Sequence, residues 1–139
     1  MADLQQELDK LLTANEEKHR LYEAYQETSK DHNDKILKLA ESQPIDIKDF
    51  EEAEELYDNM ILSEKTYRIQ RDVFNRSRQD VIQKLTPVQN IKIRFSYANE
   101  KSKEKTEYYV WLKYNVESPD ESQLVIQKIS DSDNEPKLF

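Results

Sequence analysis

The sequence predicts an α+β protein in which a long antiparallel helical hairpin, a two-helix coiled coil, is followed by a small three-stranded antiparallel sheet. Apolar residues recur at alternating spacings of three and four up to residue 85, which is the repeat of a coiled coil. Beyond Pro87 the apolar residues recur at every second position, as they do in strands. We therefore divide the chain into a helical hairpin over residues 1–86, a β module over 87–130 and a disordered tail over 131–139.

The first helix is expected over residues 3–42. It should end before Pro44, because the residue that precedes a proline is disfavoured in the α conformation. The apolar and polar residues of its coiled-coil stripe are Leu4, Leu8, Leu11, Asn15, Lys18, Tyr22, Tyr25, Ser29, His32, Ile36 and Leu39.

The second helix should begin just after Asp46 and end at Leu85. The Asp46 side chain can cap the first turn, and Ile45 can pack against Phe50 as a hydrophobic staple. The stripe of this helix consists of Phe50, Ala53, Tyr57, Met60, Glu64, Tyr67, Arg71, Phe74, Arg78, Val81 and Leu85.

The two stripes match one another when they are paired antiparallel. Leu39 then faces Phe50, and this register runs without interruption to Leu4 opposite Leu85. Each arm would have about 40 residues and a length of about 60 Å. The middle layer places Lys18 opposite Arg71, and two like charges in a seam predict that the middle is the least stable part of the hairpin.

Three strands are expected in the β module, over residues 91–97, 106–116 and 123–129. The first alternates isoleucine and aromatic residues with Lys92, Arg94 and Ser96, which is typical of a half-buried strand. The second is rich in aromatic and β-branched residues.

The composition excludes several classes of site. The chain has no glycine and no cysteine among its 139 residues, and its net charge is -8. Without glycine there is no phosphate-binding glycine loop, and without cysteine there is no disulfide and no thiolate zinc site. We see no secretory leader and no stretch of about 18 apolar residues, so we expect a cytoplasmic protein that does not enter a membrane.

We find no catalytic constellation and expect neither an enzyme nor a cofactor or metal. Glu16 and His19 have the spacing of a helical metal motif, but both fall on outward positions of the first helix. His32 lies in the seam opposite Tyr57, where a hydrogen-bonded core histidine is expected. Nucleic-acid binding is also not favoured, because the basic residues of the second helix are spread around it and the net charge is negative.

A second apolar stripe predicts self-association. Leu62, Thr66, Ile69 and Val73 lie on the face of the second helix opposite the seam, and a helix that is apolar on two faces is normally covered on both. We predict a homodimer with Leu62, Ile69 and Val73 in its interface. The alternative is that these are scattered surface aliphatic residues, which are common.

The second strand predicts a partner-binding site. Tyr109 and Trp111 lie on one face with Lys113 and Asn115, opposite a more apolar face. Aromatic anchors with a polar rim are typical of protein interfaces, so Tyr109 and Trp111 are the predicted partner-binding residues. The alternative is that both faces of the sheet are buried inside a dimer.

These observations favour a non-enzymatic, oligomerising interaction or scaffold protein that binds an unknown protein partner through its β module or its helical faces. Two alternatives stay open, a chaperone-like holder of client proteins and a nucleic-acid-binding accessory protein. The combination of helical arms with a β module is similar to that of helical cochaperones such as prefoldin subunits and the GrpE-type exchange factors. The likeness is limited to the architecture. Prefoldin places its strands between its helices, whereas here they follow both, and GrpE-type β domains use glycine, which this chain lacks.

Overall fold

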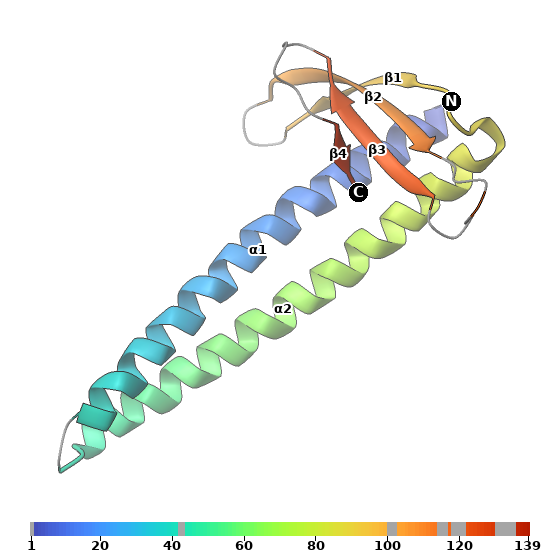
Figure 1. Ribbon diagram of the computed structural model, residues 1–139. Helices are drawn as coiled ribbons and strands as arrows, with labels where there is room; N and C mark the ends of the chain where they lie inside the picture. The colour runs from blue at the N-terminus through green and yellow to red at the C-terminus, as the bar shows by residue number, and fades with distance from the viewer. Residues whose placement is uncertain (1, 42–43, 100–102, 114–116, 118–121, 130–135) are drawn as a thin grey trace. The chain divides into compact units, whose positions relative to one another are not determined.

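The computed structural model describes residues 2–41, 44–99, 103–113, 117, 122–129 and 136–139. Two long helices, α1 (Ala2–Glu41) and α2 (Ile47–Leu85), pack against each other as an antiparallel hairpin (Figure 1). A short 3₁₀ turn, η1 (Thr86–Val88), leads into four strands, which are β1 (Ile93–Ala98), β2 (Lys105–Lys113), β3 (Gln123–Lys128) and β4 (Lys137–Leu138). The predicted α+β fold with a helical hairpin is confirmed.

The chain forms two compact units, and both helices run through each of them. One unit combines residues 1–14 and 74–139, and we call it the sheet unit. The other consists of residues 15–73 and contains only the paired helices, and we call it the arm.

The start of α2 agrees with the predicted cap. The Asp46 carboxylate accepts a hydrogen bond from the Lys48 backbone N–H at 3.0 Å, and the Asp46 carbonyl accepts the first helical bond from the Phe50 N–H at 3.1 Å. These two bonds satisfy backbone donors that otherwise have no partner at a helix start.

Ring contacts within the arm confirm the register predicted from the two stripes. The rings of Tyr22 and Tyr67 lie 5.2 Å apart, and those of His32 and Tyr57 lie 5.4 Å apart, centroid to centroid. Both pairs are exact partners in the antiparallel alignment of the sequence. Side-chain burial in the arm is nonetheless slight, since Leu39 and Ala53 are its only buried apolar residues among those described.

The sheet unit has a four-stranded antiparallel meander of order β1-β2-β3-β4. Val110 of β2 lies between Ile93 of β1 and Ile126 of β3 in the register. Alternate residues therefore point to opposite faces of the sheet.

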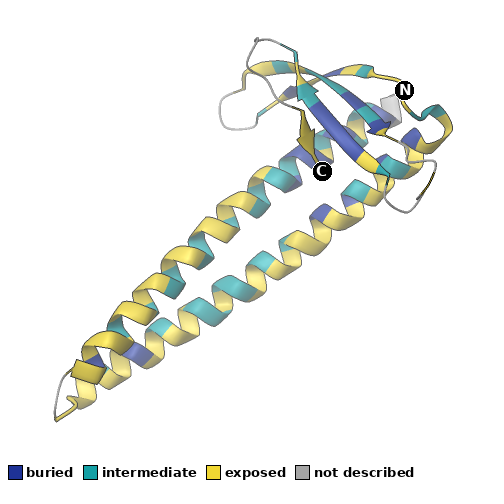
Figure 2. Ribbon diagram, in the orientation of Figure 1, coloured by how far each residue is buried: buried dark blue, intermediate teal, exposed yellow. Residues whose placement is uncertain are grey.

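One face of the sheet forms a core with the helix segments of the same unit (Figure 2). The Gln5 side-chain amide donates to the Ser96 carbonyl at 2.7 Å, and the hydroxyls of Thr13 and Tyr97 lie 3.2 Å apart, so α1 is also tied to β1 by polar contacts. The buried residues of this core are Leu4, Leu8, Leu11, Leu12, Ala14, Phe74, Val81, Leu85, Phe95, Tyr97, Val110, Leu112, Leu124 and Ile126.

A fourth strand is the main departure from the sequence prediction of three. Lys137 and Leu138, in the segment for which we predicted disorder, pair with Ile126 and Val125 of β3; residues 131–135 lie outside the described part of the chain. The Phe139 N–H donates to the Leu124 carbonyl at 2.8 Å, and the Phe139 ring lies 6.2 Å from that of Phe74. A two-residue strand held by such distant contacts leaves no periodic signal in the sequence.

Turns are built without glycine. Asn90 adopts a φ of 65° after η1, and Lys103 adopts a φ of 56° before β2. Asparagine tolerates this left-handed region better than most residues, whereas lysine is disfavoured there. The Asn90 N–H donates to the Leu112 carbonyl at 2.9 Å, and this bond fixes the turn to β2.

Candidate functional site

The face of the sheet opposite the core carries both predicted partner-binding residues, and we call it the outer face. Val110 and Leu112 of β2 are buried in the core, whereas Tyr109 and Trp111 are half-buried on the outer face. The structure therefore places Tyr109 and Trp111 together, as the alternation of the sequence predicted.

An apolar row crosses the outer face. Trp111 of β2 is the register partner of Val125 of β3, and Val125 is in turn the partner of Leu138 of β4. Val125 is only 3% exposed although it does not face the helices. Trp111 and Leu138 flank it, and Leu138 itself is exposed. The row therefore offers one covered aliphatic residue between two accessible apolar side chains.

Basic groups border this row. The Lys92 ammonium lies 4.7 Å from the centroid of the Trp111 ring, a distance at which a cation is attracted to the face of an aromatic ring. Lys113, two residues beyond Trp111, is exposed. A hollow of about 410 Å³ is lined by Asn90, Lys92, Trp111, Lys113, Gln123, Val125, Pro136 and Leu138.

The neighbouring row of the outer face is polar and electrically balanced. Tyr109 is the register partner of Arg94 on one side and of Gln127 on the other. Arg94 donates a hydrogen bond to the Glu107 carboxylate, which raises the pKa of the guanidinium above its ordinary value. Because this pair neutralises itself, Lys92 and Lys113 carry the positive charge beside Trp111.

Sequence reasoning missed three members of this surface, Lys92, Val125 and Leu138. The first two follow from alternation once the register of the strands is known, since each lies beside Trp111 across the sheet. Leu138 carries no such signal, because β4 was not predicted.

The residues predicted for a homodimer interface lie on α2 in the arm. Leu62, Ile69 and Val73 are 64%, 66% and 43% exposed. The hydroxyl of Thr66, between them on the same face, donates to the Leu62 carbonyl at 2.9 Å. This side of α2 is thus apolar and uncovered in a single chain.

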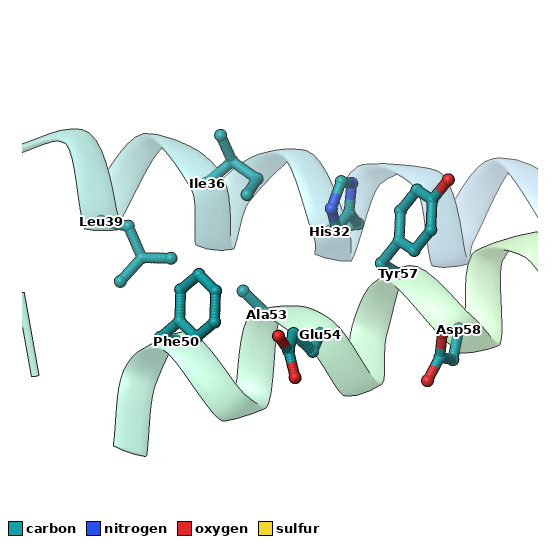
Figure 3. A pocket seen from close by; sticks show the side chains of 8 residues that line it. All are labelled: His32, Ile36, Leu39, Phe50, Ala53, Glu54, Tyr57 and Asp58. Carbon is teal, nitrogen blue, oxygen red and sulfur yellow. The ribbon is translucent and has the colours of Figure 1, made fainter. Parts of the chain in front are cut away.

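The arm also contains a cleft that the sequence did not predict as a site (Figure 3). It measures about 380 Å³ and opens between α1 and α2 near the hairpin turn. In Figure 3, Leu39 of α1 approaches Phe50 and Ala53 of α2, and the His32 ring lies beside that of Tyr57. The full lining is His32, Ile36, Leu39, Phe50, Ala53, Glu54, Tyr57 and Asp58.

His32 differs from the expectation of a hydrogen-bonded core histidine. Its Nδ1 atom is buried and has no hydrogen-bond partner among the described residues. The imidazole instead makes a tilted contact with Tyr57. The side chain packs in the seam without the polar partner that would orient a catalytic base.

Lys35 joins the two helices next to this cleft. The Lys35 ammonium of α1 donates to Glu52 at 2.7 Å and to Asp49 at 3.1 Å, both on α2. These hydrogen bonds, the one to Glu52 being the stronger cause, raise the pKa of Lys35 above its ordinary value.

The described residues contain no group of three or more His, Asp or Glu side chains placed to hold a metal ion. Glu16 and His19 are both exposed on α1. Across the part of the chain that the structure describes, neither helix has an apolar stretch long enough to cross a membrane. No family model, no curated protein and no solved structure matches this chain.

Proposed function

We propose that this protein is a non-enzymatic, cytoplasmic interaction protein that binds a protein partner through the outer face of its sheet. The observation that supports it is the row of Trp111, Val125 and Leu138 next to Lys92 and Lys113. A half-buried tryptophan beside aliphatic residues, with a charged rim, has the composition of interface hot spots.

The chemistry of the outer face also suggests the kind of partner. Its apolar row favours aliphatic or aromatic side chains, and Lys92 and Lys113 favour carboxylates. We therefore propose a partner that presents apolar residues together with Asp or Glu. Two lysines beside the apolar row, on a chain of net charge -8, are few for binding a polyanion, so a nucleic acid is the less favoured ligand.

The test compares three purified forms of the protein, which are the wild type, Trp111→Ala and Ile91→Ala. Ile91 is an exposed apolar residue of the same unit outside β1 and serves as the matched control. Partners captured by the wild type from native cells are identified, and their binding is measured by calorimetry. We expect Trp111→Ala to raise the Kd about 30-fold, because hot-spot truncation costs about 2 kcal/mol, and Ile91→Ala to leave it unchanged.

Thermal melts separate binding from folding. Removal of Trp111 uncovers Val125 and is expected to cost about 1–2 kcal/mol, less than the roughly 3–5 kcal/mol of a core tryptophan. A Trp111→Ala variant that binds the partner as tightly as the wild type contradicts the proposal. A variant whose sheet melts at a far lower temperature shows that Trp111 is a core residue instead. Binding that falls with salt more steeply than the contacts of two lysines allow indicates a nucleic acid.

A chaperone-like holder is the second candidate, and the exposed apolar residues near the hairpin turn favour it. Leu37, Ile45, Ile47 and Phe50 are all exposed there, next to the cleft in the arm. Such a holder would suppress the aggregation of an unfolded client, would lose this activity on Phe50→Glu and would keep it on Trp111→Ala.

We also infer that the protein assembles as a homodimer through the uncovered side of α2.

A further inference from the structure

The uncovered side of α2 has the repeat of a second coiled-coil seam. Leu62, Thr66, Ile69 and Val73 follow one another at spacings of four, three and four residues, which is the repeat of the core positions of a coiled coil. Leu62, Ile69 and Val73 are exposed. Thr66 is compatible with an apolar layer, because its hydroxyl is already bonded to the Leu62 carbonyl.

This stripe is complementary to itself when two copies run antiparallel. A two-fold axis between Thr66 and Ile69 places Leu62 of one copy against Val73 of the other, and Thr66 against Ile69. Four layers then form, each with a larger aliphatic residue against a smaller or β-branched one. Self-complementarity of this kind is the requirement of a two-fold dimer interface.

The charges beside the stripe favour the same orientation. Lys65 directly precedes Thr66, and Asp72 directly precedes Val73, so both charged residues lie along the same edge of the stripe. In an antiparallel coiled coil, this edge of one helix faces the same edge of the other. Lys65 of one copy therefore lies near Asp72 of the other, twice per dimer. Within the described part of the chain, neither residue forms an ion pair. In a parallel dimer Lys65 would instead lie near Gln70, without a charge partner.

We propose that a second copy of this chain packs on α2 in this antiparallel register, with two reciprocal Lys65–Asp72 pairs. The proposal rests on the homodimer inferred above. It adds the antiparallel orientation of the two α2 helices and the charge pairs that select this orientation. Because the seam is short, we expect a dissociation constant in the micromolar range rather than the nanomolar range.

The apolar part is tested by sedimentation velocity over a concentration series around about 10 µM. Wild type should shift from monomer to dimer across the series. Ile69→Glu places a carboxylate in two layers of the dimer and should raise the Kd about 100-fold or more. Leu37→Glu is the matched control, since Leu37 is equally exposed in the same unit but lies on α1, and it should not change the Kd.

The orientation is tested by charge exchange. Lys65→Glu and Asp72→Lys each place like charges together in the antiparallel dimer, and each should raise the Kd about tenfold, whereas the double variant should return it to within about threefold of wild type. Helicity by circular dichroism is measured for each variant, because Asp72→Lys adds a third cation to the Arg68 and Arg76 side of the helix.

A zero-length carbodiimide cross-link on the wild type gives a second measurement that does not depend on variants. In a mixture of ¹⁴N and ¹⁵N copies, mixed-isotope Lys65–Asp72 peptides are expected. If the protein dimerises but gives no Lys65–Asp72 cross-link, and the double variant does not recover the wild-type Kd, the antiparallel register is wrong. Self-association itself is not contradicted by that result. A wild type that stays monomeric throughout overturns both, while partner binding through Trp111 is measured independently.

Discussion

Lys18 places a positive charge in the predicted seam of the arm. It lies in the middle layer of the predicted pairing, opposite Arg71. Its side chain is partly buried, and this burial lowers the pKa of the ammonium below its ordinary value of 10.5. The folded state therefore disfavours the charged form of Lys18.

Replacing this charge should stabilise the arm. We expect Lys18→Met to raise the free energy of unfolding at neutral pH by about 0.5 kcal/mol, a small gain because solvent still reaches much of the side chain. Lys30→Met, at an exposed position of α1, is the control and should have no effect. A Lys18→Met protein that melts below the wild type would show that the cation stabilises the seam.

The same variant predicts a pH dependence with a defined sign. Because the pKa of Lys18 is lower in the folded state, the unfolded state binds more protons between the two pKa values, and wild-type stability rises with pH there. The advantage of Lys18→Met should therefore shrink as the pH approaches and passes the ordinary lysine pKa of 10.5. Urea melts of both proteins at several pH values measure this difference in the free energy of unfolding.

The sequence predicts the position of single residues correctly where hydrophobic periodicity, either strand alternation or the heptad repeat, defines a face. Alternation placed Tyr109 and Trp111 on one face, and the heptad placed Tyr22 against Tyr67. Neither pattern indicates which residues lie beside Trp111 on other strands, so Lys92 and Leu138 were found only with the register in hand. His32 Nδ1 has no hydrogen-bond partner among the residues that the structure describes, and this too has no signal in the sequence.

At the scale of the elements, both helices and the first three strands agree with the sequence prediction to within a few residues over the described part of the chain. The predicted ends at residue 42 and at residues 114–116 lie outside the described residues. The helices are bounded by prolines and by the Asp46 cap, which are local signals. The strand β4 was missed because it depends on long-range contacts, among them the hydrogen bond at 2.6 Å from Arg78 Nε to the Phe139 carbonyl. Local residue propensities contain no information on contacts between residues that are far apart in the sequence.

The packing of α1 against α2 in the arm is stabilised partly by Lys35, which bonds to two carboxylates of α2. Its hydrogen bonds to Glu52 and Asp49 raise its folded-state pKa, so this contribution to stability is fully present below the ordinary lysine pKa and is lost as the pH rises through the folded-state value. Lys35→Met should therefore lower the Tm at pH 8 but have no effect at strongly alkaline pH.

Salt provides the control for this prediction. The difference between wild type and Lys35→Met should decrease between 0.05 and 1 M NaCl, because partly exposed ion pairs are screened (the Debye length falls to about 3 Å at 1 M). Lys30→Met again serves as the neutral comparison. A difference that is constant with salt and pH would show that Lys35 acts by packing its alkyl chain.

At the scale of the whole molecule, apolar burial is distributed unequally between the two units. The sheet unit contains a contiguous core with Leu8, Leu11, Val81 and Leu85 fully buried, whereas the arm has Leu39 and Ala53 as its buried apolar residues among those described. Apolar burial is the dominant favourable term in folding, so we expect the units to differ in local stability.

Hydrogen exchange measured by NMR tests this difference. Backbone amides of β2, β3 and the helix segments of the sheet unit should exchange about 100-fold more slowly than those of residues 15–73, because poorly buried segments open locally without global unfolding. Leu8→Ala should cost about 2–5 kcal/mol and should reduce protection throughout the sheet, since Leu8 belongs to the core beneath β2 and β3. Leu37→Ala, at an exposed site of the arm, should leave the sheet unchanged. Equal protection in both units would instead show that the hairpin and the sheet unfold as one cooperative structure.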